Sequence, residues 1–158
     1  MLRTFLILAA LAPVIGAQTA TAPETPPIEV TGQISQIDSQ VWAGFNAGPG
    51  LFMSVRNVSA HGIRGYVYET VFTDAETGKA LSHSRQHSTY KRPSSGVALA
   101  AGAIDASGKP YEVPASQSGV LAQFSVKVDL VIFDDGSTWG PGQLRLSKTL
   151  LARIAAAN

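Results

Sequence analysis

The sequence predicts an antiparallel β-sandwich, and three observations support that fold class. Residues 120–132 place an apolar side chain at every second position, which is the period of a strand with one buried face. Other short stretches rich in β-branched and aromatic residues are separated by turn sequences about every ten residues. The chain does not alternate strands with long helices, the pattern that would indicate a parallel sheet.

The N-terminal residues 1–17 are predicted to be a secretory signal peptide. A short positive start containing Arg3 precedes an apolar run over residues 5–14, and small residues follow at Gly16 and Ala17. Cleavage after Ala22 is the alternative. Residues 18–27 are rich in proline and threonine, so we expect a flexible leader there and a single domain over residues 28–158.

Composition narrows the classes of protein to which the chain belongs. It contains no cysteine, which argues against a disulfide scaffold, a thiol enzyme or a thiolate metal site. Of its 12 basic residues, Arg3 leaves with the signal, so 11 basic residues face 11 acidic ones. This balance argues against nucleic acid as a partner. We expect a periplasmic or extracellular protein that does not span the membrane once the signal is removed and that needs no cofactor.

The elements of the sandwich are predicted in order from their apolar periodicity and from the turns between them. Residues 63–74 carry bulky residues on both faces and are predicted to form a central strand. The stretch at 120–132 ends in a turn at Asp134, Asp135 and Gly136, with a short return strand after it. Ser147 is predicted to cap a C-terminal helix that begins at about residue 146. The other predicted strands are 28–37 with a partly buried continuation at 41–45, 51–55, 80–90, 97–99 and 111–114.

Two polar motifs are predicted to be turns. Asn57, Val58 and Ser59 match a glycosylation acceptor, but their position between two predicted strands favours a turn. Asp134 and Asp135 resemble a carboxylate pair, yet a following glycine and two flanking strands again favour a turn.

Four motifs in order resemble a known type of exported domain. They are residues 55–59 (VRNVS), 63–74 (IRGYVYETVFTD), 77–79 (TGK) and 128–141 (VDLVIFDDGSTWGP). Together they resemble immunoglobulin-like sandwich domains of exported, mostly uncharacterised bacterial proteins, and loosely those of the late-embryogenesis-abundant type. The likeness covers roughly residues 28–141 and implies an immunoglobulin-like fold and a secreted setting. It implies no catalytic residue, and the immunoglobulin disulfide is absent.

Histidines and serines raise the question of an enzyme. His83 and His87 are four residues apart, a spacing that would suit half of a zinc site on a helix. Here the surrounding residues predict a strand, and neither a cysteine nor an acidic residue lies nearby to complete the site. The serines between residues 82 and 95 lack the Gly-x-Ser-x-Gly elbow of a hydrolase. A hydrolase or metalloenzyme is therefore the least favoured class, and we expect no catalytic residue and no metal ligand.

The favoured function is a non-catalytic binding or structural module that engages a protein or an envelope polymer. A carbohydrate-binding module using Trp139 and Trp42 is the alternative. Tyr66 and Tyr68 are expected to fill the core. The candidate binding surface comprises Trp139, Trp42, Tyr90, Lys79, Arg85, Lys91 and Arg92.

Overall fold

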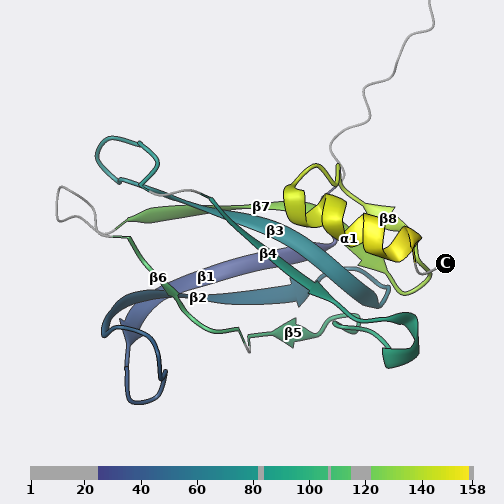
Figure 1. The fold of residues 1–158 in the computed structure, drawn as a ribbon, viewed down its shortest axis with the longest axis horizontal. Helices are drawn as coiled ribbons and strands as arrows, with labels where there is room; N and C mark the ends of the chain where they lie inside the picture. The colour runs from purple at the N-terminus through teal and green to yellow at the C-terminus, as the bar shows by residue number, and fades with distance from the viewer. Residues whose placement is uncertain (1–24, 82–83, 107, 115–121, 157–158) are drawn as a thin grey trace, which may run out of the picture.

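A computed structural model describes residues 25–81, 84–106, 108–114 and 122–156 (Figure 1). The expected signal peptide and most of the expected leader lie outside these residues. Among the described residues, Pro27 is buried and its carbonyl accepts a hydrogen bond from the Val58 N–H (3.0 Å). The ordered fold therefore includes the last residue of the expected leader.

The described residues form strands, one short 3-10 helix and one α-helix. In chain order they are β1 (Ile28–Ile37), β2 (Gly48–Asn57), β3 (Ile63–Thr73), β4 (Arg85–Tyr90), η1 (Pro93–Ser95), β5 (Ile104–Asp105), β6 (Tyr111–Glu112), β7 (Gln123–Phe133), β8 (Thr138–Trp139) and α1 (Arg145–Ala155).

The strands build two antiparallel sheets, which confirms the predicted class of a mainly antiparallel β protein with a C-terminal helix. In the first sheet β2 pairs with β1 along its whole length and with the short β5 and β6 on its other side. In the second sheet the order is β4-β3-β7-β8. β3 is therefore central, as its two bulky faces predicted.

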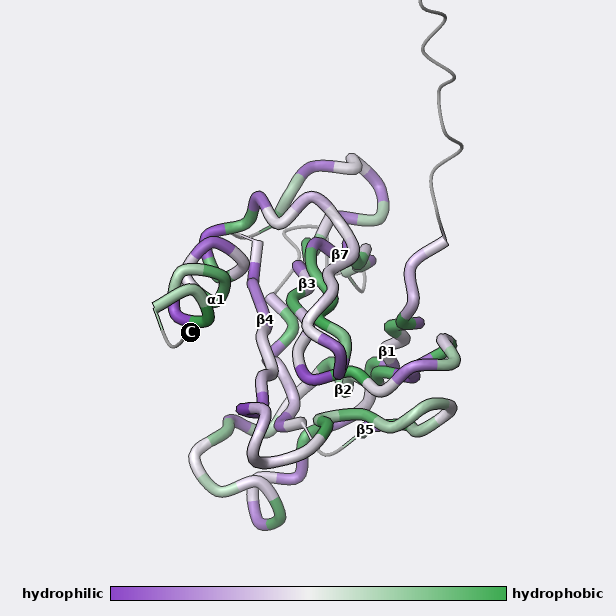
Figure 2. Tube along the Cα trace, turned by 90° about the vertical axis from the view of Figure 1, so that its right-hand side faces the viewer, coloured by the Kyte–Doolittle hydropathy of each residue, from purple (hydrophilic) through white to green (hydrophobic). Residues whose placement is uncertain are grey.

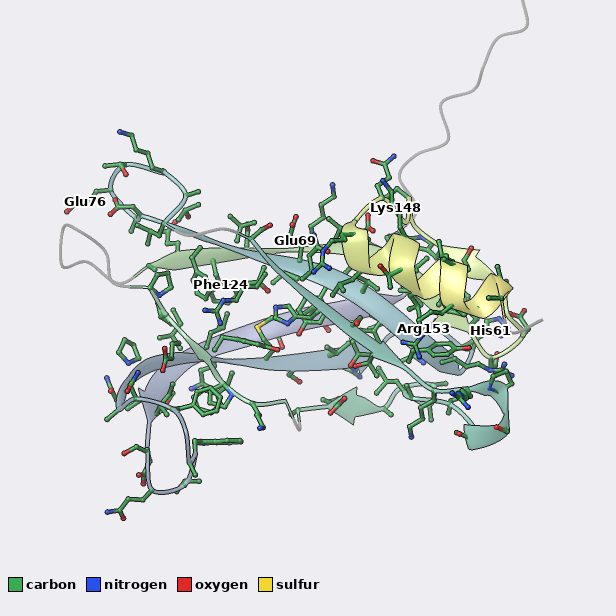
Figure 3. The ribbon with its side chains drawn as sticks, in the orientation of Figure 1. His61, Glu69, Glu76, Phe124, Lys148 and Arg153 are labelled. Atoms are coloured by element: carbon green, nitrogen blue, oxygen red, sulfur yellow. The ribbon has the colours of Figure 1, made fainter. Side chains whose placement is uncertain are left out.

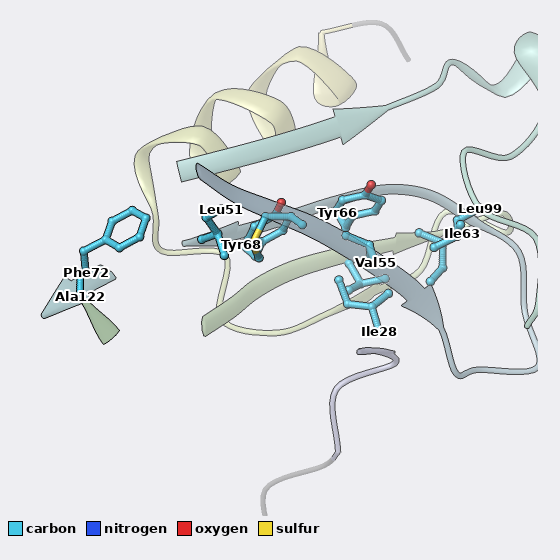
Figure 4. Close-up of a cluster of buried hydrophobic side chains, with 11 residues drawn as sticks. Ile28, Leu51, Val55, Ile63, Tyr66, Tyr68, Phe72, Leu99 and Ala122 are labelled. Carbon is cyan, nitrogen blue, oxygen red and sulfur yellow. The ribbon is translucent and has the colours of Figure 1, made fainter. Parts of the chain in front are cut away.

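One core lies between the two sheets. It contains Ile28, Leu51 and Val55 from the first sheet, and Tyr66 and Phe72 from the second (Figure 4). β3 and β7 carry many of the hydrophobic residues coloured green in Figure 2, whereas β4 is mainly polar. Burial of these side chains is the main favourable term for the packing of the two sheets.

The long C-terminal strand β7 departs from the predicted alternation at Asp129. Val67 of β3 pairs with Leu130, but the next residue, Tyr68, pairs with Val128. Asp129 is thus the extra residue of a β-bulge, and the faces of the strand exchange there. The expectation that every apolar side chain from 120 to 132 shares one face is wrong; residues 120 and 121 also lie outside the described part.

The bulge sends the apolar residues of β7 to two different partners. Phe124, Val126 and Val128, before the bulge, pack on the core between the sheets. After it, Leu130 and Ile132 pack against the helix α1 on the outer face, while Val131 lies in the inter-sheet core. β7 therefore contributes both to the core between the sheets and to the contact between the second sheet and α1.

Asp129 itself anchors the helix. Its side chain is 1 % exposed, and its Oδ2 accepts hydrogen bonds from the Leu144 N–H (2.9 Å) and the Ser147 hydroxyl (2.5 Å). Its backbone carbonyl accepts a further bond from the Gly142 N–H (3.0 Å). The bond from the Leu144 N–H satisfies one of the backbone donors that the start of an α-helix leaves without an internal partner, and the other two bonds hold the preceding turn and the first turn of α1 against β7.

Two expectations about this region are corrected. Ser147 does not cap the helix, because α1 begins at Arg145 and Ser147 lies within the first turn, buried against Asp129. The single buried face predicted for residues 120–132 would leave the Asp129 side chain exposed, whereas it is 1 % exposed. The helix packs on the outer face of the sheet through Leu150, Leu151 and Ile154.

Some shorter elements also differ from expectation. Residues 41–45 form a turn rather than a continuation of the first strand, and Val41 is 70 % exposed. The strand expected over 80–90 begins at Arg85, and the one expected at 97–99 is reduced to a single bridge between Ile63 and Leu99. β5 was not predicted. Among the described residues, no helix has the length and apolar character needed to cross a membrane.

We predict that Asp129→Ala lowers the free energy of unfolding by about 3 kcal/mol, because it leaves two donors near the start of α1 without their acceptor. Urea denaturation at neutral pH measures the change. Asp135→Ala is the matched control, since that exposed carboxyl accepts only local bonds within the β7–β8 turn. Equal stability losses in the two variants would contradict the anchoring role of Asp129.

Candidate functional site

A cleft of about 390 Å³ opens along one side of the molecule, between the two sheets. Its walls are β4, at the edge of one sheet, and the short β5 and β6, at the edge of the other (Figure 1). β5 and β6 each pair with β2 through just two residues, so the edge of the first sheet is incomplete there. The volume is within the usual range for small-ligand pockets.

The opposite side of the sandwich is filled. A Cβ at Gly32 of β1 would lie 2.8 Å from Cζ of Phe124, so the Phe124 ring occupies the space directly over that glycine. Phe124 extends from β7, where Figure 3 labels it. The space between the two sheets is therefore filled on the β1–β7 side, and the cleft opens on the β4 side.

Antiparallel pairing places the inward side chains of the cleft. Tyr66 lies opposite Thr89, and Tyr68 lies opposite His87, and opposed residues of an antiparallel pair share a face. Figure 4 shows Tyr66 and Tyr68 side by side, with their hydroxyl oxygens directed the same way. Tyr111 approaches them from β6, on the other sheet.

Four rings form a continuous series across the cleft. The rings of Tyr66 and Tyr68 are stacked with centroids 6.3 Å apart, and the His87 ring lies 4.8 Å from Tyr68. Tyr111 completes the series, with its ring centroid 4.4 Å from that of His87. These rings link β4 to β6, two edge strands between which the described residues show no backbone pairing.

The polar groups of the cleft are partly paired with one another. The Tyr66 hydroxyl donates to Oδ2 of Asp105 (3.4 Å), and it also bonds to the Thr89 side chain. The Tyr68 and Tyr111 side chains share a hydrogen bond. His87 differs from them: its Nε2 is buried and has no hydrogen-bond partner among the described residues.

Burial decides the protonation of these groups. It raises the pKa of Tyr66, Tyr68 and Tyr111 above 10.0, so all three hydroxyls remain protonated at neutral pH. Burial, and secondarily the positive charge of Arg85, lowers the pKa of His87 below 6.5. The cleft therefore presents neutral aromatic groups, each able to donate or accept hydrogen bonds at neutral pH.

The structure does not gather the expected aromatic residues into one surface. Trp42 lies in the turn after β1 and meets Phe52 edge-on, with centroids 6.1 Å apart. Trp139 is half-buried on β8 and lines a second hollow of about 410 Å³ beside Val58. The two tryptophans thus lie at opposite ends of β2. Tyr90 is half-buried, with its ring over Gly65 and against the cluster of α1.

The basic residues are exposed but spread out. Lys79 lies in the turn before β4 and Arg85 is the first residue of that strand, whereas Lys91 and Arg92 follow its last residue. At about 3.3 Å per residue, the six-residue strand separates the two pairs by roughly 20 Å. They flank the strand that forms one wall of the cleft.

The histidines are not gathered into a metal site among the described residues, which contain no group of three metal-ligating side chains. His61 lies at the end of the molecule near β8 (Figure 3), with its ring 6.0 Å from that of Phe133. His87 lines the cleft, and His83 lies outside the described residues. Ser84, Ser88, Ser94 and Ser95 are exposed, and Ser82 also lies outside them.

The two motifs predicted as turns are confirmed. Asn57 is fully buried, and its amide nitrogen donates to the backbone carbonyls of His61 (2.7 Å), Leu99 (3.2 Å) and Ala100 (3.1 Å). Its Oδ1 accepts from Ser59. Bonds from Ser137 hold the Asp135 carboxyl and lower its pKa. Both motifs therefore serve the fold.

The prediction that Tyr66 and Tyr68 lie in the core is confirmed. The sequence did not predict the cleft that these two side chains also line. Asp105 and Tyr111 were not recognised because the short strands that carry them have little periodicity. Comparison with protein-family models, with curated proteins and with solved structures found no match to the chain. The function therefore has to be inferred from the cleft itself.

We predict that His87 makes stability depend on pH. Because its pKa is lowered in the folded chain, the unfolded chain takes up a proton first as the pH falls. The stability that neutral His87 provides is complete above about pH 6.5 and declines below it. The free energy of unfolding should fall more steeply between about pH 7 and pH 5.5 in the wild type than in His87→Phe.

Urea denaturation across this pH range tests the prediction, with Met53→Leu, a change at a cleft residue that carries no titratable group, as the control. The control variant should keep the slope of the wild type. The same slope in His87→Phe and the wild type would show that the His87 environment does not disfavour the charged ring.

Proposed function

We propose that the chain is an exported, non-catalytic binding module, and that its ligand binds in the cleft between β4 and the β5–β6 edge. The observation that carries the proposal is the composition of the cleft. A series of neutral rings from both sheets surrounds it, and the buried Nε2 of His87 has no partner among the described residues. Ligand sites commonly combine aromatic walls with a few placed polar groups.

The proposal includes the features expected from the sequence. Export rests on the signal-like residues 1–17, and the partner is a protein or an envelope polymer. The two antiparallel sheets support an immunoglobulin-like arrangement, which we retain as part of the proposal. The proposed module is non-catalytic: the Tyr66 hydroxyl bonds to Asp105 and Thr89, the Tyr68 and Tyr111 side chains bond to each other, and Nε2 of His87 is left for the ligand.

A second candidate uses Trp139. That side chain lines the second hollow together with Phe133, His61, Pro26 and Pro27, and an indole face there would suit a sugar ring. Trp42 would not contribute to the same site, since it lies at the other end of β2. This alternative predicts ligand effects at β8 and not at β4.

Gly108 offers a direct test, because it lines the cleft and, its two chain neighbours aside, no heavy atom lies within 4 Å of the place where a Cβ would sit. We predict that Gly108→Trp fills the cleft and abolishes ligand binding without loss of stability. Ala106→Trp is the matched control, being exposed in the same loop and outside the cleft lining.

The measurement is a screen of small neutral, acidic and basic compounds, read from backbone amide shifts in NMR spectra of the whole chain. Binding compounds should shift Gln86, His87 and Tyr111 in the wild type and in Ala106→Trp, but not in Gly108→Trp. Shifts that gather around Trp139 would favour the second candidate. Shifts that persist unchanged in Gly108→Trp would contradict the cleft as the binding site.

A further inference from the structure

The hydrogen-bonding groups of the cleft suit a ligand that carries hydroxyls. The Tyr66, Tyr68 and Tyr111 hydroxyls can each donate one bond and accept two, so the bonds of Tyr66 to Asp105 and Thr89 and the bond between Tyr68 and Tyr111 leave capacity unused. His87 is neutral and offers one donor and one acceptor nitrogen. Its Nε2 is buried and lacks a partner among the described residues, and a ligand hydroxyl would bond to it after a small shift of the ring, whichever nitrogen carries the proton.

The rings of the cleft provide apolar contact for the same ligand. His87 is inclined by 33° to Tyr68 and by 51° to Tyr111, so the three rings form an angled wall and not a flat stack. Met53 and Val55 add apolar surface from the first sheet. A sugar ring combines C–H faces with peripheral hydroxyls and would satisfy both kinds of group.

The charges near the cleft favour a neutral ligand. Among the described residues that line it, Asp105 has the one ionisable acidic side chain, and there is no lysine or arginine. An anionic ligand would therefore meet a carboxyl without a lining cation. Arg85 lies outside the lining, and its positive charge, which acts on His87 and Tyr111, would oppose a cationic ligand attracted to that carboxyl.

We propose that the cleft binds a neutral, polyhydroxylated group such as a sugar unit, with Nε2 of His87 bonded to one of its hydroxyls. This inference rests on the proposed function, because it specifies the ligand of the same cleft. The sugar unit has two possible sources, a free monosaccharide or a unit within an envelope polysaccharide. The site differs from a Trp139 platform, since its rings come from β3, β4 and β6.

The test titrates the whole chain with four probes: glucose, maltohexaose, a heparin-derived oligosaccharide and a lysine-rich peptide. Calorimetry gives the affinities, and amide shifts give the location. We expect maltohexaose or glucose to shift Gln86, His87 and Tyr111. Binding of maltohexaose alone identifies a polymer unit, whereas comparable binding of glucose identifies a free sugar.

His87→Phe keeps a ring between Tyr68 and Tyr111 but removes the nitrogen. We expect it to weaken binding of the neutral sugar about tenfold, the cost of one lost hydrogen bond in a partly buried site. Asp135→Ala, in the exposed β7–β8 turn, is the control and should bind as the wild type does. Tyr111→Phe is a second variant that removes one hydroxyl with little change in packing, and it should also weaken binding.

The outcomes separate the inference from the proposed function. If the heparin-derived oligosaccharide or the peptide shifts the cleft residues and the neutral sugars do not, the ligand class is wrong and the cleft remains a binding site. If none of the four probes, and no compound of the fragment screen, shifts those residues, both are overturned. Wild-type affinity for the sugar in both His87→Phe and Tyr111→Phe would overturn the proposed hydrogen bonding.

Discussion

The hydrogen bonds to the buried carboxyl of Asp129 hold the helix α1 on the outer face of the second sheet, and the rest of the arrangement depends on them. Asp129 lies at the β-bulge, where the side chains of β7 change from one face of the sheet to the other. It accepts hydrogen bonds from the Leu144 N–H and the Ser147 hydroxyl at the start of α1. The backbone after β8 also packs closely against Asp129. A Cβ at Gly140 would lie about 2.5 Å from the Asp129 carbonyl oxygen, and φ of Gly140 is +96°, so this position requires glycine. Bulge, turn and helix start therefore form one unit, and a buried polar group of this kind is costly to leave unsatisfied.

The position of the helix also determines which face of β4 remains available. Gln86 points to the helix side, where its Oε1 accepts the Leu146 N–H (3.0 Å), and Tyr90 lies over Gly65 on the same face. His87 and Thr89 consequently face the interior, toward Tyr111 and Asp105. The alternation of β4 thus directs Gln86 and Tyr90 to the helix side, and His87 and Thr89 to the cleft.

Much of the fold could be predicted from the sequence, because alternation over residues 28–37 and 63–74 carries a strong strand signal. The bulge could not, since apolar residues recur at every second position through Asp129 and suggest one buried face. A weaker signal was present in Leu130, Val131, Ile132 and Phe133: four consecutive apolar residues indicate a strand buried on both sides. That signal also explains why the strand needs a helix on its outer face.

The candidate site was harder to predict from the sequence than the fold. Tyr66 and Tyr68 were recognisable as one face of a strand, but the register that sets His87 opposite Tyr68 depends on how β4 pairs. Tyr111 is more than 40 positions away from Tyr68 and reaches the cleft only through the packing of the two sheets. The exposed aromatic and basic residues were easier to notice, and the structure distributes them over separate parts of the surface.

The most direct test of this account is a set of methyl NOE measurements on β7, because the bulge assigns neighbouring side chains to opposite layers. The account predicts NOEs from Leu130 and Ile132 to Leu150 and Ile154 of α1, with Val131 directed to the core between the sheets. NOEs from Leu130 and Ile132 to Met53 and Val55 of β2 would contradict it. That result would mean that β7 alternates without a bulge and that the cleft is not formed as described.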